Sequence, residues 1–378
     1  MSTQELFNRI MSYQKFDRIP TIVFENFEVS TLERWRYEGL PPDQSPIEYL
    51  DMDKITHLPV SFLPIPGYDD GILAENEESF VQIDFMGATV KRLKSNPSMY
   101  YGYIDYPVKS RDDWKRYKER FNASSSGRLP EYLTATPRNL FEHSPLLVDS
   151  RSIVDKADLI KLNQSGDLLM LHFFPFFFRL GFYSMGMERF MMAFYDMPDL
   201  IHEMFDFWIK FTIETIKPLM GHVRIDIAAF TEDFAYKTGP HLSPEIYKEF
   251  FIPYQNILVS ELKKYDINVI GVWTAGNADA YLPILLENGV NCFLILEQQA
   301  GMDPIKLREK YGKELLLIGG IAKEALISGP IALDKEIDRL MPLIRQGGYI
   351  PAIDDMIPPE VPFSHYVHYV KRLKEIKI

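Results

Sequence analysis

Apolar runs alternate with amphipathic segments along most of the chain, and this alternation predicts its architecture. Strand-like runs occupy residues 167–174, 225–230, 268–273, 292–296, 315–318 and 349–353. Helix-like segments, in which apolar residues recur every three or four positions, follow these runs. Strands that alternate with helices form parallel sheets. With a further run at 19–24, roughly seven or eight strands can be counted, which predicts an α/β fold, a single (β/α)8 TIM barrel.

The N-terminal part departs from this regular pattern. Residues 76–92 alternate around the turn Asp84-Phe85-Met86-Gly87 and predict a hairpin, whereas 105–128 is charged and helical in character. We interpret both segments as insertions over one face of the barrel. The sequence therefore predicts one domain over residues 1–378, with insertions in 1–165 and regular β/α units in 166–378.

Charge and cysteine content limit the classes of partner. The formal net charge of -12 disfavours nucleic acid and anionic membranes as main partners, because like charges repel at long range. No apolar run reaches the ~18 residues that a membrane helix needs. The single cysteine, Cys292, cannot form an internal disulfide, so we expect a cytoplasmic protein.

Polar residues gather where the predicted strands end, which is where barrel enzymes place their active sites. A carboxylate that follows a buried run is costly unless it is paired, bound to metal or facing a site, which favours Asp233, Glu297 and Asp355 as catalytic residues. His172 is the one histidine that the pattern places near the strand ends. The candidates for substrate binding are Glu25, Asp84, His172, Phe178, Arg179, Glu232, Trp273, Asn277 and Asp354. Core packing, turn capping or ion pairing is the structural alternative for each of them.

The order of several short motifs resembles the uroporphyrinogen decarboxylase superfamily. These motifs include Glu232-Asp233, Ser243-Pro244-Glu245, Pro253-Tyr254, Gly301-Met302-Asp303, Lys310-Tyr311-Gly312, Gly319-Gly320-Ile321 and Gly347-Gly348-Tyr349-Ile350. The resemblance is strong over the C-terminal part of the chain and weak in the N-terminal part. It implies a distorted (β/α)8 barrel with its active cleft at the C-terminal strand ends, and a homodimer as the assembly.

The resemblance implies one of two chemistries, decarboxylation of uroporphyrinogen or corrinoid-linked methyl transfer. True decarboxylases have an arginine-rich segment after the first strand, where this chain has Glu25-Asn26-Phe27-Glu28. Acids there would oppose the carboxylates of the substrate. Coenzyme-M methyltransferases carry His-x-Cys zinc ligands where this chain has Trp273-Thr274-Ala275, which excludes a thiolate zinc site there. Demethylating members of the superfamily, which use carboxylate and histidine ligands, resemble the chain more closely.

The sequence thus predicts a methyltransferase that removes a methyl group from a small substrate, such as a methoxylated aromatic. The group would pass to the corrinoid carried by a separate protein. A zinc ion is one expectation, although the His-x-Cys ligands usual for it are absent. Glu297 and Asp355 are the candidate ligands. Magnesium or a site without metal is the alternative. Two other functions stay open. One is a cofactor-free decarboxylase of uroporphyrinogen or another small acid, and the other is a non-catalytic barrel that binds a ligand or a corrinoid.

Overall fold

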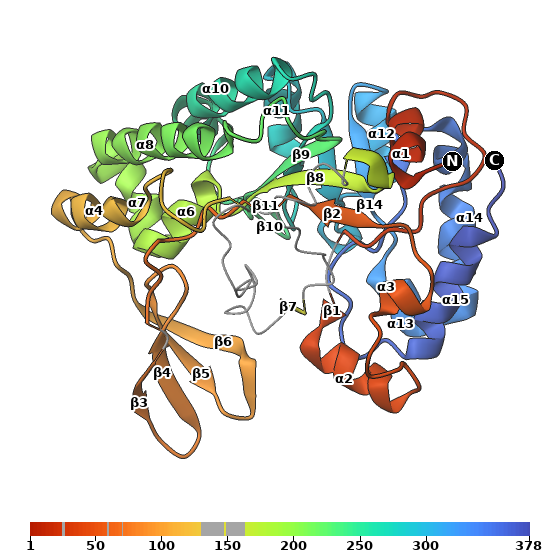
Figure 1. The fold of residues 1–378 in the computed structure, drawn as a ribbon, viewed down its shortest axis with the longest axis horizontal. Coiled ribbons are helices and arrows are strands. Elements are labelled where there is room, and N and C mark those ends of the chain that lie inside the picture. Colours follow the sequence, from red (N-terminus) through yellow and green to blue (C-terminus); the bar gives the residue numbers. More distant parts are fainter. Residues whose placement is uncertain (25–26, 59, 70, 130–146, 149–162) are drawn as a thin grey trace.

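A parallel sheet forms the centre of the computed structural model, which describes residues 1–24, 27–58, 60–69, 71–129, 147–148 and 163–378 (Figure 1). The sheet has seven strands in the order β15-β14-β13-β12-β9-β8-β2, and every neighbouring pair is parallel. Its members are β2 (Ile55–His57), β8 (Leu168–Phe173), β9 (Ile227–Thr231), β12 (Ile270–Trp273), β13 (Cys292–Ile295), β14 (Leu316–Gly319) and β15 (Tyr349–Ile350). The expected α/β class and strand count are confirmed.

The central strands are almost entirely apolar because both of their faces are covered. Every residue of β9, β12, β13 and β14 is buried. Strands covered on two faces have continuous apolar runs rather than an alternating pattern. This is why the sequence pattern located these strands to within a few residues.

The sheet is curled around the first helix, α1 (Thr3–Met11). This helix contacts both β8 and β15, although these strands are well separated in the sheet order. Gly348 N, which precedes β15, donates to Ile10 O at 2.7 Å, and Gln4 N donates to Gly166 O, which precedes β8, at 3.0 Å. Helix α1 therefore closes the N-terminal end of the curled sheet and leaves the C-terminal strand ends for the polar residues.

The helices that follow the strands lie mostly where the periodicity predicts them. They are α6 (Phe177–Met185), α7 (Met187–Asp196), α8 (Pro198–Ile216), α9 (Pro244–Ile246), α10 (Ile252–Lys263), α11 (Leu282–Glu287), α12 (Pro304–Tyr311), α13 (Lys323–Ser328), α14 (Pro330–Gln346) and α15 (Phe363–Lys374). Ser243 caps α9 by accepting from Ile246 N, with Pro244 at the first helical position. Short turns complete three of these units, a π-helical turn η3 (Tyr247–Phe251) and the 3-10 turns η4 (Asp279–Tyr281) and η5 (Gln298–Ala300).

The expected first strand at 19–24 is wrong, since these residues, all of them described, form no strand. Their segment is fixed through Asp53 instead, whose carboxylate accepts from Thr21 N at 2.8 Å and pairs with Arg18. Strand β2 takes the place beside β8. Its three residues are too few to produce a periodic signal. The short elements β1 (Phe27–Glu28), α2 (Val29–Tyr37), α3 (Pro46–Tyr49) and β7 (Leu147–Val148) complete this region.

A second sheet stands away from the main one (Figure 1). It is antiparallel and consists of β3 (Ile72–Glu75), β4 (Ser79–Ile83), β5 (Thr89–Leu93) and β6 (Asn96–Asp105), followed by α4 (Arg111–Tyr117) and the 3-10 turn η1 (Lys118–Arg120). The predicted hairpin around Asp84 is the β4–β5 pair. In the described part of the chain, no helix combines the length and apolar character that crossing a bilayer requires.

Candidate functional site

Four neighbouring strands bring three rings and one hydroxyl group together at their C-terminal ends. His57 ends β2, His172 lies near the end of β8, and Trp273 ends β12. The ring centroids of His57 and His172 are 5.6 Å apart, and those of His172 and Trp273 are stacked at 5.0 Å. His172 Nε2 lies 2.5 Å from the hydroxyl oxygen of Thr231, the last residue of β9. We call His57, His172, Thr231 and Trp273 the ring layer.

The ring layer contains a residue that the sequence did not single out. His57 was missed because it ends a three-residue strand that has no sequence signal. The interpretation of His172 as the one histidine near the strand ends is therefore incomplete. Imidazole is a common general acid or base in enzymes, and this end of the sheet carries two of them.

Asp233 forms an ion pair with Arg179 beside this layer. Its Oδ2 pairs with Arg179 Nη2, and its Oδ1 accepts weakly from Ala275 N at 3.5 Å. Asp233 has a φ of +53°, a left-handed backbone that is uncommon outside glycine and frequent at functional sites. The pair is accessible, because the side chains of Arg179 and Asp233 are 22% and 39% exposed.

Aromatic groups surround the guanidinium of Arg179. Its Nη1 donates to the Tyr183 hydroxyl at 2.9 Å, and its centre lies 5.8 Å from the Phe174 ring and 5.7 Å from the Tyr183 ring. Burial raises the pKa of Tyr183, so its hydroxyl stays protonated at neutral pH. The cation is thus oriented by one carboxylate and by ring faces.

Glu232 lies behind this pair and is fully buried. Its Oε2 accepts from Phe178 N at 2.7 Å, and burial raises its pKa to about 8. The Phe178 ring is buried too and stacks on His241 at 5.4 Å. The structure therefore places both of these candidate substrate-binding residues beneath the Arg179–Asp233 pair, with neither side chain exposed at the edge.

The next carboxylate along the edge, Glu297, is bound to backbone. Its Oε2 accepts from Gly276 N at 2.8 Å. Gly276 has a φ of +79°, and a Cβ there would lie 2.5 Å from Ala235 O, so only glycine fits. Asn277 serves the same turn, because its Nδ2 donates to Ala300 O at 2.9 Å and its Oδ1 accepts from Asp279 N.

Two adjacent acids after β15 differ in environment. Asp354 is buried and accepts from Gln298 N at 3.0 Å and from Lys323 N at 2.8 Å, and burial raises its pKa to about 7. Asp355 is partly exposed and pairs with Lys323 Nζ. Asp354 therefore fixes the loops after β13 and β14, whereas Asp355 stays partly exposed in its pair with Lys323.

The two candidate zinc ligands are each engaged elsewhere. Glu297 accepts from Gly276 N, and Asp355 pairs with Lys323. Over the described ranges, no three or more His, Cys, Asp or Glu side chains are grouped so that they could hold a metal ion. This donor set does not fit a zinc site of the usual four-ligand type.

The remaining N-terminal candidates differ in what can be said of them. Glu25 lies outside the described residues. Asp84 is buried in the β4–β5 turn, where its carboxylate accepts from Met86 N at 2.9 Å and Ala88 N at 2.8 Å. Burial raises its pKa to about 6. The adjacent Phe85 instead reaches the site, with its ring 5.2 Å from that of Tyr183.

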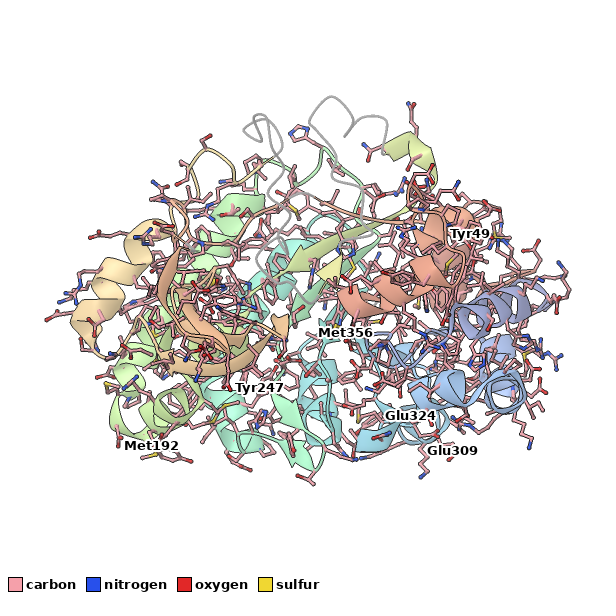
Figure 2. All side chains as sticks on the ribbon, turned by 90° about the horizontal axis from the view of Figure 1, so that it is seen from below. Tyr49, Met192, Tyr247, Glu309, Glu324 and Met356 are labelled. Carbon is pink, nitrogen blue, oxygen red and sulfur yellow. The ribbon has the colours of Figure 1, made fainter. Side chains whose placement is uncertain are left out.

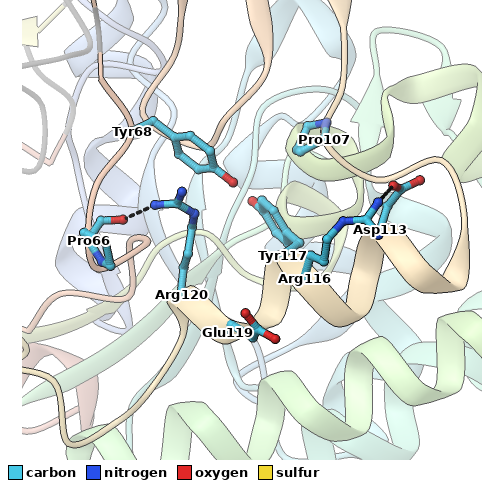
Figure 3. Close-up of a pocket in the computed structure, with 8 residues that line it drawn as sticks. All are labelled: Pro66, Tyr68, Pro107, Asp113, Arg116, Tyr117, Glu119 and Arg120. Carbon is cyan, nitrogen blue, oxygen red and sulfur yellow. Dashed lines mark hydrogen bonds and ion pairs between the residues drawn. The ribbon is translucent and has the colours of Figure 1, made fainter.

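A surface pocket of about 560 Å³ lies apart from these strand ends (Figure 3). It is lined by Pro66, Tyr68, Pro107, Asp113, Arg116, Tyr117, Glu119 and Arg120. Arg120 lies 4.3 Å over the Tyr68 ring and donates to Pro66 O at 2.7 Å. None of the residues predicted for the site lines it.

Comparison with known proteins places this geometry in a family context. Residues 176–376, more than half of the chain, match the family model described as uroporphyrinogen decarboxylase (URO-D). Among solved structures, a methyltransferase from Methanosarcina mazei matches with a TM-score of 0.58 and 14% identity, over 99% of this chain and 99% of that chain. A B12-independent methionine synthase from Shewanella sp. W3-18-1 in complex with selenomethionine matches with a TM-score of 0.37 and 11% identity, over 60% of this chain and 67% of that chain. No curated protein matches the sequence.

Proposed function

The chain belongs to the uroporphyrinogen decarboxylase (URO-D) family, and on that premise we propose that it is a methyltransferase for a small methylated substrate. The methyl acceptor in this proposal is the corrinoid of a separate protein. The similarity in fold to a methyltransferase over nearly the whole chain supports the proposal. A homodimer and a cytoplasmic location belong to it as well, on the family resemblance and the single cysteine.

The observation that carries the proposal is the placement of the Arg179–Asp233 pair beside the ring layer. Phe174 and Tyr183 add ring faces around Arg179. Apolar and aromatic surfaces with a few oriented polar groups are typical of sites for small, flat ligands. A methoxylated arene has these properties, and it is the substrate class that we propose.

The same edge of the sheet is poorly suited to a polyanionic tetrapyrrole. Arg179 and Lys323 are the cations described above for this edge, and Asp233 and Asp355 already neutralise them. Glu297 and Asp354 add further carboxyl groups. A substrate with many carboxylates would meet like charge, which disfavours the uroporphyrinogen reaction.

Removal of a methyl group from an aryl ether requires a group that stabilises negative charge on the ether oxygen and a group that supplies a proton to it. The bond between the methyl carbon and the ether oxygen breaks, the electron pair stays on oxygen, and the oxygen takes up a proton. Arg179, held by Asp233, is the group that would stabilise the developing charge, and the imidazoles of His57 and His172 are the groups that would supply the proton. An oriented donor of this kind contributes about 3 kcal/mol to the transition state.

The test is an anaerobic assay of methyl transfer from a panel of methoxyarenes to cob(I)alamin. The reaction is monitored by the decrease in cob(I)alamin absorbance. Arg179→Met should lower the rate roughly 100-fold, because it removes the oriented donor. Asp233→Asn should also lower it, while Asp206→Asn, which breaks the exposed ion pair with Lys210 on α8, serves as the matched control. An Asp233→Asn protein as active as wild type would contradict the assigned site.

A decarboxylase of a small monoacid is the second candidate, because Arg179 is a cation suited to a single carboxylate. Release of CO2 from an aromatic acid without methyl transfer would favour it. Binding of panel compounds without turnover of either kind would favour the non-catalytic barrel.

A further inference from the structure

One hydrogen bond links the two chain segments that carry the Arg179–Asp233 pair. Phe178 immediately precedes Arg179, and Glu232 immediately precedes Asp233. Phe178 N donates to Glu232 Oε2 at 2.7 Å. The start of α6 and the end of β9 are therefore joined directly beneath the pair, so the position of Glu232 determines how its neighbours meet.

A second buried polar side chain, Gln255 of α10, lies beside Glu232. Gln255 is fully buried, and its Nε2 donates to the Tyr247 hydroxyl at 2.7 Å. Burial raises the pKa of Glu232 by more than the nearby Gln255 amide lowers it. Among the described residues, neither Glu232 Oε1 nor Gln255 Oε1 has a hydrogen-bond partner. A fully buried carboxylate oxygen without a donor is costly, and a proton on the carboxyl group removes its charge.

The charges around Glu232 favour its neutral form. Arg179 on α6 and Asp233 after β9 face it and already balance each other. Tyr247 on η3 (Figure 2) and Tyr281 on η4 are stacked at 4.2 Å and add no charge. Ionised Glu232 would therefore leave an uncompensated negative charge in a fully buried place, which is costly.

We propose that Glu232 is a positioning residue, a neutral carboxylic acid that joins the start of α6 to the end of β9 and holds the Arg179–Asp233 pair in its working geometry. The role in catalysis rests on the proposed methyl transfer, whereas the role in geometry does not. When Glu232 loses its proton, a second carboxylate competes with Asp233 for Arg179. The π-helical turn that carries Tyr247 is a distortion often found at functional sites.

The protonation of Glu232 is tested by infrared difference spectra of the purified protein, recorded during a titration between about pH 6 and pH 10. The band of a neutral carboxyl group should disappear with a midpoint near pH 8 in wild type. Glu232→Gln should lack this component, which separates it from Asp354 and Asp84. Asp226→Asn is the matched control, because Asp226 is a buried acid that immediately precedes β9. This variant should leave the band in place. A wild type without this component would overturn the proposal.

A second variant assigns the band if Glu232→Gln does not fold. Gln255→Leu removes a side chain that lowers the pKa of Glu232, so the midpoint should rise. An unchanged midpoint would mean that the band does not belong to Glu232, and the proposal would be wrong.

Positioning is tested by the ¹⁵N signal of the Arg179 guanidinium in arginine-labelled protein, identified by its loss in Arg179→Lys. It should shift with the Glu232 midpoint in wild type and stay constant in Glu232→Gln. The rate of transfer from 2-methoxyphenol to cob(I)alamin should fall roughly tenfold per pH unit above that midpoint, and Glu232→Gln should lack this fall. An Arg179 signal that does not shift at the pH of the Glu232 midpoint would overturn the positioning role. If the signal follows it but no methyl transfer occurs, the positioning role stands and the proposed methyltransferase function fails.

Discussion

Replacing Glu232 by glutamine should stabilise the protein at neutral pH, although it changes a fully buried polar residue. The amide is nearly isosteric with the neutral acid. Its oxygen can accept from Phe178 N, as the oxygen of the acid does. Glutamine therefore reproduces this hydrogen bond of the protonated acid without its titration.

The magnitude follows from the difference in pKa between the folded and unfolded states. Burial raises the pKa of Glu232 from 4.5 to about 8. Between these values the folded state holds a proton that the unfolded state has lost, so the stability of wild type falls as the pH rises. The fall is roughly 1.4 kcal/mol per pH unit, or about 3 kcal/mol at pH 7 relative to pH 4. Glu232→Gln lacks this loss and should be more stable than wild type by that amount.

The assay is urea unfolding of both proteins at several pH values between about 4 and 9. The two free energies of unfolding should be nearly equal at pH 4 and should diverge up to pH 8, with the variant above wild type. Since other groups titrate in both proteins, only the difference is compared. A difference that does not depend on pH, or a variant that is less stable at pH 7 than at pH 4 relative to wild type, would refute the reasoning.

Two further predictions concern the loops at the other end of the edge. Asp354→Ala should destabilise the protein by about 3 kcal/mol because Gln298 N and Lys323 N lose their buried acceptor. Asp355→Ala should cost under about 1 kcal/mol because its pair with Lys323 is partly exposed, and equal losses by denaturant unfolding would be inconsistent with the assigned environments. Gly319→Ala should lower stability by about 3 kcal/mol or more, because Gly319 has a φ of +111° and a Cβ would collide with Ile295 O. Gly67→Ala, with open space around the new methyl group, should change the melting temperature little, and a tolerated Gly319→Ala would contradict the packing of β14 on β13.

The regular half of the fold could be predicted because its strands are buried on both faces. Strands β9, β12, β13 and β14 have continuous apolar runs bounded by polar turns. Strand β2 was missed since its three residues, Ile-Thr-His, carry no periodicity. The run at 19–24 resembles a strand in composition, but its backbone bonds go to Asp53 instead. Hydrogen-bond partners that are distant in sequence cannot be read from a local pattern.

The positions of several candidate residues could be predicted, but their contacts could not. The polar residues do collect at the C-terminal strand ends, and the sequence identified Arg179, Asp233, His172 and Trp273 there. Which neighbours bind them depends on side-chain packing. Glu232 and Asp233 are adjacent in sequence and both follow β9, yet one is fully buried and the other is accessible. His57 depended on the missed strand. The assigned roles of these residues in catalysis stay predictions.

The most direct test of the central claim is a crystal structure of the protein soaked with 2-methoxyphenol. The account predicts that the ring lies at the C-terminal strand ends, in contact with Trp273 or His57, with its methoxy oxygen within hydrogen-bonding distance of Arg179 or an imidazole. A ligand bound only in the pocket beside Arg120 and Tyr68, or side chains of Arg179, His172 and Trp273 that line no common site, would contradict it.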